Sequence, residues 1–117
     1  MEFIETAAFT RSLPVYLDDE GYRRFQTHLM KNPQAGKVIP GAGGLHKVRW
    51  TDPQRGKGKR GGLRIIYYYL LEASHIWLIA LYDKDEMDDL TTAQKTAYRR
   101  FITEIKIAWT AMRMVKM

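Results

Sequence analysis

Residues 63–71 read LRIIYYYLL and follow the glycine-rich, basic segment 56–62, which reads GKGKRGG. The apolar run contains one charged residue, Arg64, and is rich in β-branched and aromatic side chains, which favour strands. A near-continuous apolar run is typical of a central strand that is covered on both faces. Because side chains alternate along a strand, we expect Arg64, Ile66 and Tyr68 to share one face. The cations of residues 56–62 are then held at the edge of a rigid sheet.

The next apolar run, residues 76–82 (IWLIALY), is predicted to be a strand antiparallel to the first. The connection through residues 72–75 is too short for the crossover that parallel strands require. An antiparallel return carries the chain back to the level of the basic segment. We therefore expect Tyr82 and Lys84 to lie near Arg64.

Residues 45–50 (LHKVRW) are predicted to form another strand, in which polar and apolar residues alternate. The alternation places Lys47 and Arg49 together on one face with Leu45. Residues 33–44, which are rich in glycine and proline, are expected to be a surface loop that leads into this strand. One face of the strand is therefore predicted to be basic and solvated.

The N-terminal third is expected to supply helices. Residues 3–9 are apolar enough for a first strand or for the lead into a helix capped by Thr10 or Ser12, and Pro14 is expected to limit that helix to a first turn. The acidic residues 18–20 favour the start of a second helix through capping and the macrodipole. That helix should end at Asn32.

A long helix is predicted near the C-terminus. Thr91 and Gln94 have the spacing of a capping box, and an amphipathic stripe of about five or six turns follows. The apolar residues of this stripe are Tyr98, Phe101, Ile105, Ala108 and Met112. Residues 109–117, which are rich in methionine, are either an adaptable contact for a partner or a frayed end. A single α+β domain over residues 1–117 is expected, with N-terminal helices packed on a small twisted, mainly antiparallel sheet and a C-terminal helix.

The surplus positive charge of the chain is concentrated in one region. The formal net charge is +6, and residues 46–64 alone hold seven basic residues against one acidic residue, again a net of +6. A local surplus indicates a local anionic partner. The alternative is that the basic segment has no binding role and is only a solvated hairpin tip.

Composition and motifs exclude several classes of protein. The absence of cysteine excludes disulfides and thiolate metal sites. The three histidines are not spaced as metal ligands, so no metal and no cofactor are expected.

The start of the chain does not read as a secretory signal, and no apolar run is long enough to span a bilayer. A cytoplasmic protein without membrane association is therefore expected. The acidic residues between 83 and 89 are expected to solvate a loop and to favour the helix that follows.

Cations around a sheet edge, with Tyr68, Tyr82 and His46 expected nearby as aromatic groups, suit single-stranded nucleic acid. Charge holds the phosphates, and rings stack on the bases. Fixed cations can also stabilise the transition state of phosphoryl transfer. RNA cleavage of this kind uses the 2′-OH of the substrate as nucleophile and requires no metal. The residues alone leave binding and cleavage both open. The candidate substrate-binding residues are Lys47, Arg49, Lys57, Lys59, Arg60, Tyr68 and Tyr82.

Four segments in order resemble HigB-like toxins of the RelE/ParE superfamily: residues 43–49 (GGLHKVR), 56–62, 64–68 (RIIYY) and 82–90 (YDKDEMDDL). The resemblance covers roughly residues 3–105. It implies a RelE-like fold of the microbial ribonuclease type. It also implies the toxin of a type II toxin–antitoxin pair, a ribosome-dependent endoribonuclease that cleaves mRNA and inhibits translation.

The resemblance also implies roles for individual residues. Arg64 would stabilise the transition state, Lys84 would be a second cation or the general acid, and Glu86 is a candidate general base. The basic turn, Lys57 to Arg60, would grip the RNA. The sequence departs from RelE after the last strand, where Asp85 and Leu90 stand in place of an arginine and a tyrosine.

The partners implied by the resemblance are a HigA-like helix-turn-helix antitoxin, the ribosomal A site with its mRNA, and operator DNA bound through the toxin–antitoxin complex. Two alternatives are a ParE-like inhibitor of DNA gyrase and an RNA-binding module without activity. The complete set of cations, Lys57, Lys59, Arg64 and Lys84, argues against the gyrase inhibitor.

Overall fold

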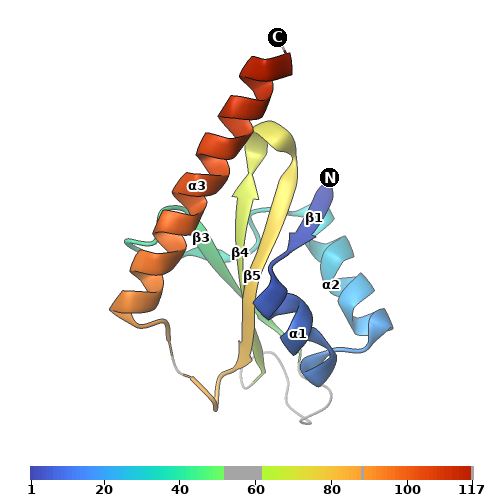
Figure 1. The fold of residues 1–117 in the computed structure, drawn as a ribbon. Helices are drawn as coiled ribbons and strands as arrows, with labels where there is room; N and C mark the ends of the chain where they lie inside the picture. The colour runs from blue at the N-terminus through green and yellow to red at the C-terminus, as the bar shows by residue number, and fades with distance from the viewer. Residues whose placement is uncertain (52–61, 88, 117) are drawn as a thin grey trace.

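The computed structural model describes residues 1–51, 62–87 and 89–116, and it shows a five-stranded sheet between two helical layers (Figure 1). The strand order is β1-β5-β4-β3-β2, with β1 parallel to β5 and the other neighbours antiparallel. The elements are β1 Glu2–Glu5, α1 Ala7–Tyr16, α2 Asp19–Lys31, β2 Lys37–Val38, β3 Leu45–Trp50, β4 Leu63–Leu70, a 3-10 turn Leu71–Ala73, β5 His75–Asp83 and α3 Thr92–Lys116. The α+β architecture predicted from the sequence is therefore confirmed.

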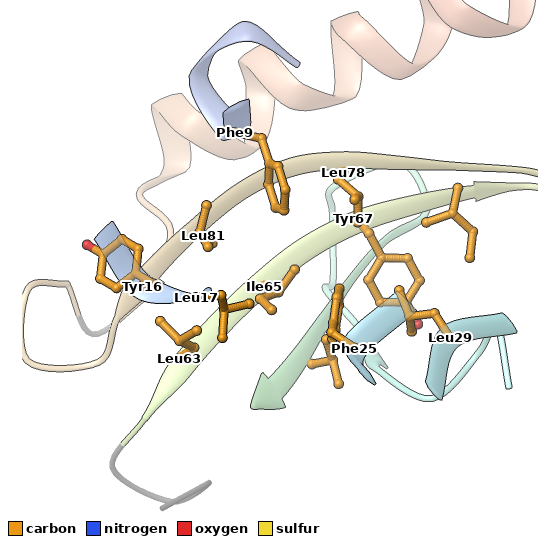
Figure 2. Packing of buried hydrophobic residues seen from close by; sticks show 12 residues of the cluster. Phe9, Tyr16, Leu17, Phe25, Leu29, Leu63, Ile65, Tyr67, Leu78 and Leu81 are labelled. Atoms are coloured by element: carbon orange, nitrogen blue, oxygen red, sulfur yellow. The ribbon is translucent and has the colours of Figure 1, made fainter. Parts of the chain in front are cut away.

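The strand β4 lies at the centre of the sheet, as its apolar run predicts. It pairs with β3 on one side and β5 on the other, and its side chains are buried apart from the half-buried Tyr69. The helices α1 and α2 pack on one face of the sheet. Figure 2 shows this cluster, in which Phe9 and Tyr16 of α1 and Phe25 and Leu29 of α2 lie against the sheet. We call this side of the sheet the α1/α2 face.

The helix α3 packs on the opposite side, which we call the α3 face. Ile102 and Ile105 of this helix lie in a second buried cluster with Ile66, Tyr68 and other residues of the sheet. The alternation predicted for β4 is confirmed, because its odd-numbered residues lie in the first cluster and Ile66 and Tyr68 in the second. Two separate cores thus hold β4 from both sides.

The helix α1 differs from its prediction. It begins at Ala7, and its N-cap is Thr6, whose hydroxyl accepts a hydrogen bond from the amide of Phe9 at 3.1 Å. Neither Thr10 nor Ser12 is the cap. Pro14 lies near the end of a ten-residue helix, so the expectation that it limits the helix to a first turn was wrong. Because α1 begins at Ala7, about two turns of the helix precede Pro14. Only the last turn of the helix therefore loses a backbone hydrogen bond.

The helix α2 agrees with its prediction, but the segment after it does not. Asp18 caps α2 by accepting a hydrogen bond from Gly21 at 2.7 Å, and Asn32 is the C-cap. The expected loop of residues 33–44 contains the short edge strand β2. Gly36 precedes this strand and permits its close approach to β3, because a Cβ atom there would lie 2.9 Å from the carbonyl oxygen of Lys47.

The capping box of α3 is confirmed. The Thr91 hydroxyl accepts from the Gln94 amide at 3.1 Å, and the Gln94 side chain accepts from the Thr91 amide at 2.8 Å. The helix then runs for 25 residues, longer than the predicted five or six turns. Trp109 is half-buried and its ring lies 5.6 Å from that of His75, whereas Val115 is 86% exposed. Among the described residues, no helix is long and apolar enough to cross a membrane.

Tyr67 offers a test of how β4 is held to the segment before β2. Its hydroxyl donates to the Pro33 carbonyl at 2.8 Å and accepts from the Gly36 amide at 3.0 Å. Tyr67→Phe leaves both backbone groups without this partner, so we expect urea denaturation to show a loss of about 1–3 kcal/mol in the free energy of unfolding. Tyr69→Phe is the matched control, because the Tyr69 hydroxyl has no hydrogen-bond partner in the described part of the chain. Equal losses in the two variants would contradict this account.

Candidate functional site

A row of polar side chains crosses three strands at one end of the α3 face. The register places Arg49 of β3 directly opposite Arg64 of β4, and Arg64 directly opposite Tyr82 of β5. Lys47 lies two residues before Arg49 and therefore on the same face. The predicted meeting of Arg64 with Tyr82 is thus confirmed, and β3 adds both of its basic residues to the same face. We call Lys47, Arg49, Arg64 and Tyr82 the cationic row.

Arg64 is more deeply buried than its position at a strand end implies. Its residue is only 7% exposed, and its guanidinium donates to the carbonyl oxygens of Gly62 and Leu63, each at 3.3 Å. A buried guanidinium interacts with other charges more strongly than one in water, because the surrounding dielectric is lower. Arg64 is therefore a fixed, largely desolvated cation.

The segment between β5 and α3 reaches across the cationic row. The carboxylate of Asp89 lies 3.7 Å from the Lys47 ammonium on β3. Burial raises the pKa of Tyr82, the negative charge of Asp89 raises it further, and the positive charge of Arg64 opposes the shift. Within the described residues, the buried Tyr82 hydroxyl has no hydrogen-bond partner. Tyr82 therefore stays protonated at neutral pH and keeps a hydrogen-bond donor beside Arg64.

Lys84 lies at the same end of the sheet as Arg64. Its amide donates to the Gly62 carbonyl at 3.3 Å, which ties the exposed turn after β5 to the start of β4. Arg64 is two residues from that carbonyl. The predicted proximity of Lys84 to the level of Arg64 is confirmed for the backbone.

Glu86 occupies a structural position. One of its carboxylate oxygens, Oε1, accepts hydrogen bonds from the hydroxyl of Tyr16 and from the amide of Asp83, the latter at 3.0 Å. These contacts join the end of α1 to the turn after β5. The turn is stabilised further because the buried carboxylate of Asp83 accepts from the Asp85 amide at 2.8 Å. A role of Glu86 as general base stays a prediction.

Asp83, Glu86 and Asp89 make contacts within the connection between β5 and α3. Asp89 accepts from the Leu90 amide at 2.8 Å in addition to its contact with Lys47. The first turn of α3 contains no acidic residue, and Asp89 lies two residues before the capping residue Thr91. Support of this helix by the acidic cluster stays a prediction. Thr91 and Gln94 perform the capping.

Not every predicted site residue lies with the cationic row. Tyr68 lies opposite Leu45 and Trp77, four residues along β4 from Arg64, and is buried beneath α3 with the Lys106 ammonium 5.9 Å from its ring centroid. Its role in binding stays a prediction. The other predicted RNA contacts, Lys57, Lys59 and Arg60, lie outside the described residues.

His46, which sequence reasoning placed beside the cations as an aromatic group, lies on the other side of the sheet. It is opposite Tyr67 in the register and stacks on that ring at 5.2 Å between centroids. This position belongs to the α1/α2 face. His46 is therefore separated from Arg64 by the sheet itself, which corrects the expectation.

The positions of two charged residues near the cationic row were not predicted from the sequence. Lys37 lies on β2 directly opposite Lys47, although residues 33–44 were expected to be a loop. Asp89 was treated as one member of a solvating cluster, yet its carboxylate contacts β3. The sequence gives no signal for the pairing of β2, whose two residues are too few to show a period of two.

The cationic row can hold anionic oxygens in a defined place. Arginine offers a planar fork of donors that matches phosphate, and lysine offers a mobile point charge.

A separate hollow of about 510 Å³ lies between β1, β5 and the second half of α3. Its lining is apolar, with Glu2, Glu104 and His75 as the ionisable residues. It is unsuited to a polyanion. Among residues 1–51, 62–87 and 89–116, no histidine and carboxylate side chains gather in a group that could hold a metal ion.

Substitution of Glu86 tests whether it supports the turn. Glu86→Gln keeps a side-chain carbonyl oxygen that can accept from both Tyr16 and Asp83, so we expect unfolding in urea to be nearly unchanged. Glu86→Ala removes the acceptor and should lower the free energy of unfolding by about 1–3 kcal/mol. Glu104→Ala, at an exposed carboxylate on α3, controls for loss of a negative charge. A glutamine variant as unstable as the alanine variant would contradict the structural role.

Comparison with known proteins gives a fold relationship. No family model matches the sequence. The structure is similar to that of toxin RelE from E. coli, determined for a mutant in the free state, with a TM-score of 0.53 and 11% sequence identity over 74% of this chain and 86% of RelE. At this identity the similarity concerns the fold. The chain therefore has the RelE-like α+β fold that the sequence resemblance implied.

Proposed function

We propose that the chain is the toxin of a type II toxin–antitoxin pair and that it cleaves mRNA on the ribosome. The observation that carries the proposal is the buried Arg64, fixed between Arg49 and Tyr82 on a RelE-like fold. A plain solvated surface does not require a desolvated guanidinium opposite a second arginine. Arg64 and Arg49 lie opposite each other, and each offers the planar fork of donors that matches an anionic phosphate.

The chemistry fits transfer of a phosphoryl group within the RNA. The substrate 2′-oxygen attacks the adjacent phosphorus, the bond from phosphorus to the 5′-oxygen breaks, and the products are a 2′,3′-cyclic phosphate and a 5′-hydroxyl. Negative charge grows on the phosphoryl oxygens, and Arg64 would stabilise it in a site of low dielectric. The Tyr82 hydroxyl, which is beside Arg64 and lacks an acceptor among the described residues, could donate to the same oxygens.

Proton transfer needs a base for the 2′-OH and an acid for the leaving 5′-oxygen. Lys84 is our candidate acid, because its backbone lies beside the start of β4. Glu86 is the candidate base, although its Oε1 already accepts two hydrogen bonds. Glu86→Gln separates the two roles of this residue, because it keeps those bonds but cannot take up a proton. Loss of cleavage in a variant of unchanged stability would assign chemistry to Glu86.

A toxin requires neutralisation, so we propose a HigA-like helix-turn-helix antitoxin as partner and binding of operator DNA by the complex. The target would be mRNA in the ribosomal A site, and the protein would act in the cytoplasm. This assignment rests on the sequence motifs around residues 43–49, 56–62 and 82–90 together with the fold. The HigB-like subtype rests on the motifs alone.

Substitution of Arg64 tests the nuclease directly. Because Arg64 is buried, we pair Arg64→Ala with Arg64→Gln, whose amide can still donate to backbone carbonyls while its charge is lost. Loss of one such donor of charge stabilisation typically reduces the rate about 10²- to 10³-fold. We expect wild-type expression in bacteria to arrest growth and to create new mRNA 5′ ends within translated messages, and both variants to lose these cuts.

Arg11→Ala is the control for that experiment, because Arg11 is an exposed cation on α1, away from the α3 face. It should arrest growth and cut mRNA like the wild type. Circular dichroism and urea denaturation of each variant verify folding. Full cutting by a folded Arg64→Gln variant would overturn the assignment, and growth arrest without new 5′ ends would favour a ParE-like inhibitor of gyrase.

A further inference from the structure

A basic hollow lies at the edge of the sheet, next to the cationic row. Its volume is about 490 Å³, and its lining residues are His28, Ala35, Lys37, Lys47, Val48 and Arg49. Three of these residues are cations and none is acidic. We call it the edge pocket. It joins the end of α2 to the β2–β3 edge and shares Lys47 and Arg49 with the cationic row, whereas Lys37 and His28 belong to the pocket alone.

The pairing of β2 creates this pocket. Lys37 lies directly opposite Lys47, and Val38 opposite His46. Two lysines in this relation repel each other, and this pair is the second like-charge pair on the sheet after Arg49 and Arg64. Cations therefore continue from β4 through β3 to β2 without interruption. A two-residue edge strand gains little from such a pair unless an anion lies between the ammonium groups.

The ion pair between Lys47 and Asp89 is weak enough for a ligand to compete with it. Its contact with Asp89 is 3.7 Å long, and both side chains are partly exposed. Exposed pairs of this kind contribute little, about 0–1 kcal/mol, so a phosphate can compete for the ammonium. Lys37 itself is exposed and has no ion pair among the residues that the structure describes. The pocket thus offers one uncommitted ammonium and one that exchanges easily.

The geometry fits a chain of phosphates better than an isolated anion. Residues on adjacent strands are about 4.8 Å apart and residues i and i+2 about 6.6 Å apart, so Lys37, Lys47 and Arg49 form a short track that ends at Arg64. Val48 and Ala35 pack in the cluster under α1 and α2, so the edge pocket lies at the border of the sheet rather than on the α3 face alone. A single strand of nucleic acid with one phosphate at Arg64 could continue over the β2–β3 edge and place a neighbouring phosphate at Lys37. His28 contributes to the wall and is held against the Trp50 ring at 5.2 Å.

We propose that the edge pocket binds a backbone phosphate of the RNA strand outside the position of cleavage, with Lys37 as its main ligand. The inference rests on the proposed function in that it takes RNA as the ligand. It assigns Lys37 and the β2 strand to substrate binding. An acidic segment of a protein partner is the competing ligand, and the experiment below separates the two.

The test is the salt dependence of binding to a 2′-O-methyl oligoribonucleotide, which cannot be cleaved because its 2′-OH is blocked. Fluorescence anisotropy gives the dissociation constant of the purified protein at several salt concentrations. Each phosphate contact to a single strand contributes about 0.7 to the slope of log affinity against log salt. Lys37→Ala should flatten the slope by about 0.7 and weaken binding several-fold at low salt. Lys37→Arg, which keeps the charge, should restore both.

Arg11→Ala removes the same charge from α1 and serves as the matched control, with slope and affinity close to wild type. Urea denaturation of the Lys37 variants confirms that the fold is retained. Equal slopes for wild type and a folded Lys37→Ala variant would overturn the proposal. Unchanged RNA binding together with weaker binding to the antitoxin would overturn it as well, and would assign the pocket to the protein partner.

The outcome is independent of the cleavage experiment, because the probe cannot be cut. A wild-type protein that makes no cuts in translated messages, but whose salt slope depends on Lys37, would refute the nuclease and leave the phosphate site standing. A protein that cuts mRNA through Arg64, but whose slope does not depend on Lys37, would refute the edge pocket alone.

Discussion

The burial of β4 on both faces is the constraint on which the rest of the structure depends. Alternate side chains of this strand enter two separate cores, one under α1 and α2 and one under α3. A shift of one residue would exchange the two faces and expose an entire set of apolar side chains. The register is therefore locked, and with it the position of Arg64 between Arg49 and Tyr82. The rigid strand thus fixes a cation at one end of the sheet.

The position of Arg64 takes its guanidinium out of water, and a buried guanidinium loses hydration. Arg49 lies directly opposite it on the neighbouring strand. The structure offsets part of this cost locally: the carbonyls of Gly62 and Leu63 accept from Arg64, and Asp89 lies near Lys47. Preorganised charge of this kind stabilises a developing anion because little reorganisation is needed when the ligand arrives. The burial that takes water away from the Arg64 guanidinium is therefore also the basis of its proposed chemistry.

The two ends of the α3 face differ in character because α3 and the segment before it cover different strands. Toward the first half of β5, aromatic residues such as Trp77, Phe101 and Trp109 border an apolar hollow. Toward the start of β4 the same face carries the cationic row, and the edge pocket borders this row at the β2–β3 edge. The cationic row lies at one end of the face, and the exposed end of α3 near Val115 lies at the other.

Local pattern determined much of this protein. Apolar runs located β3, β4 and β5 and the antiparallel pairing of β4 with β5, and the capping box located the start of α3. These signals are local in sequence, because side-chain period, caps and short hairpins depend on neighbouring residues. The prediction that Pro14 limits α1 to one turn was wrong, because Thr6 and the packing of Phe9 against the sheet set the start of the helix.

Only the tertiary structure decided which charges meet. The pairing of Lys37 with Lys47, the reach of Asp89 to β3, the burial of Arg64 and the contact of Glu86 with Tyr16 all join segments that are distant in sequence or lack a periodic signal. The separation of His46 from the cations also follows from register. Composition supplies the charge, but the pairing of strands and the path of the connections determine where each charge lies and how much water surrounds it.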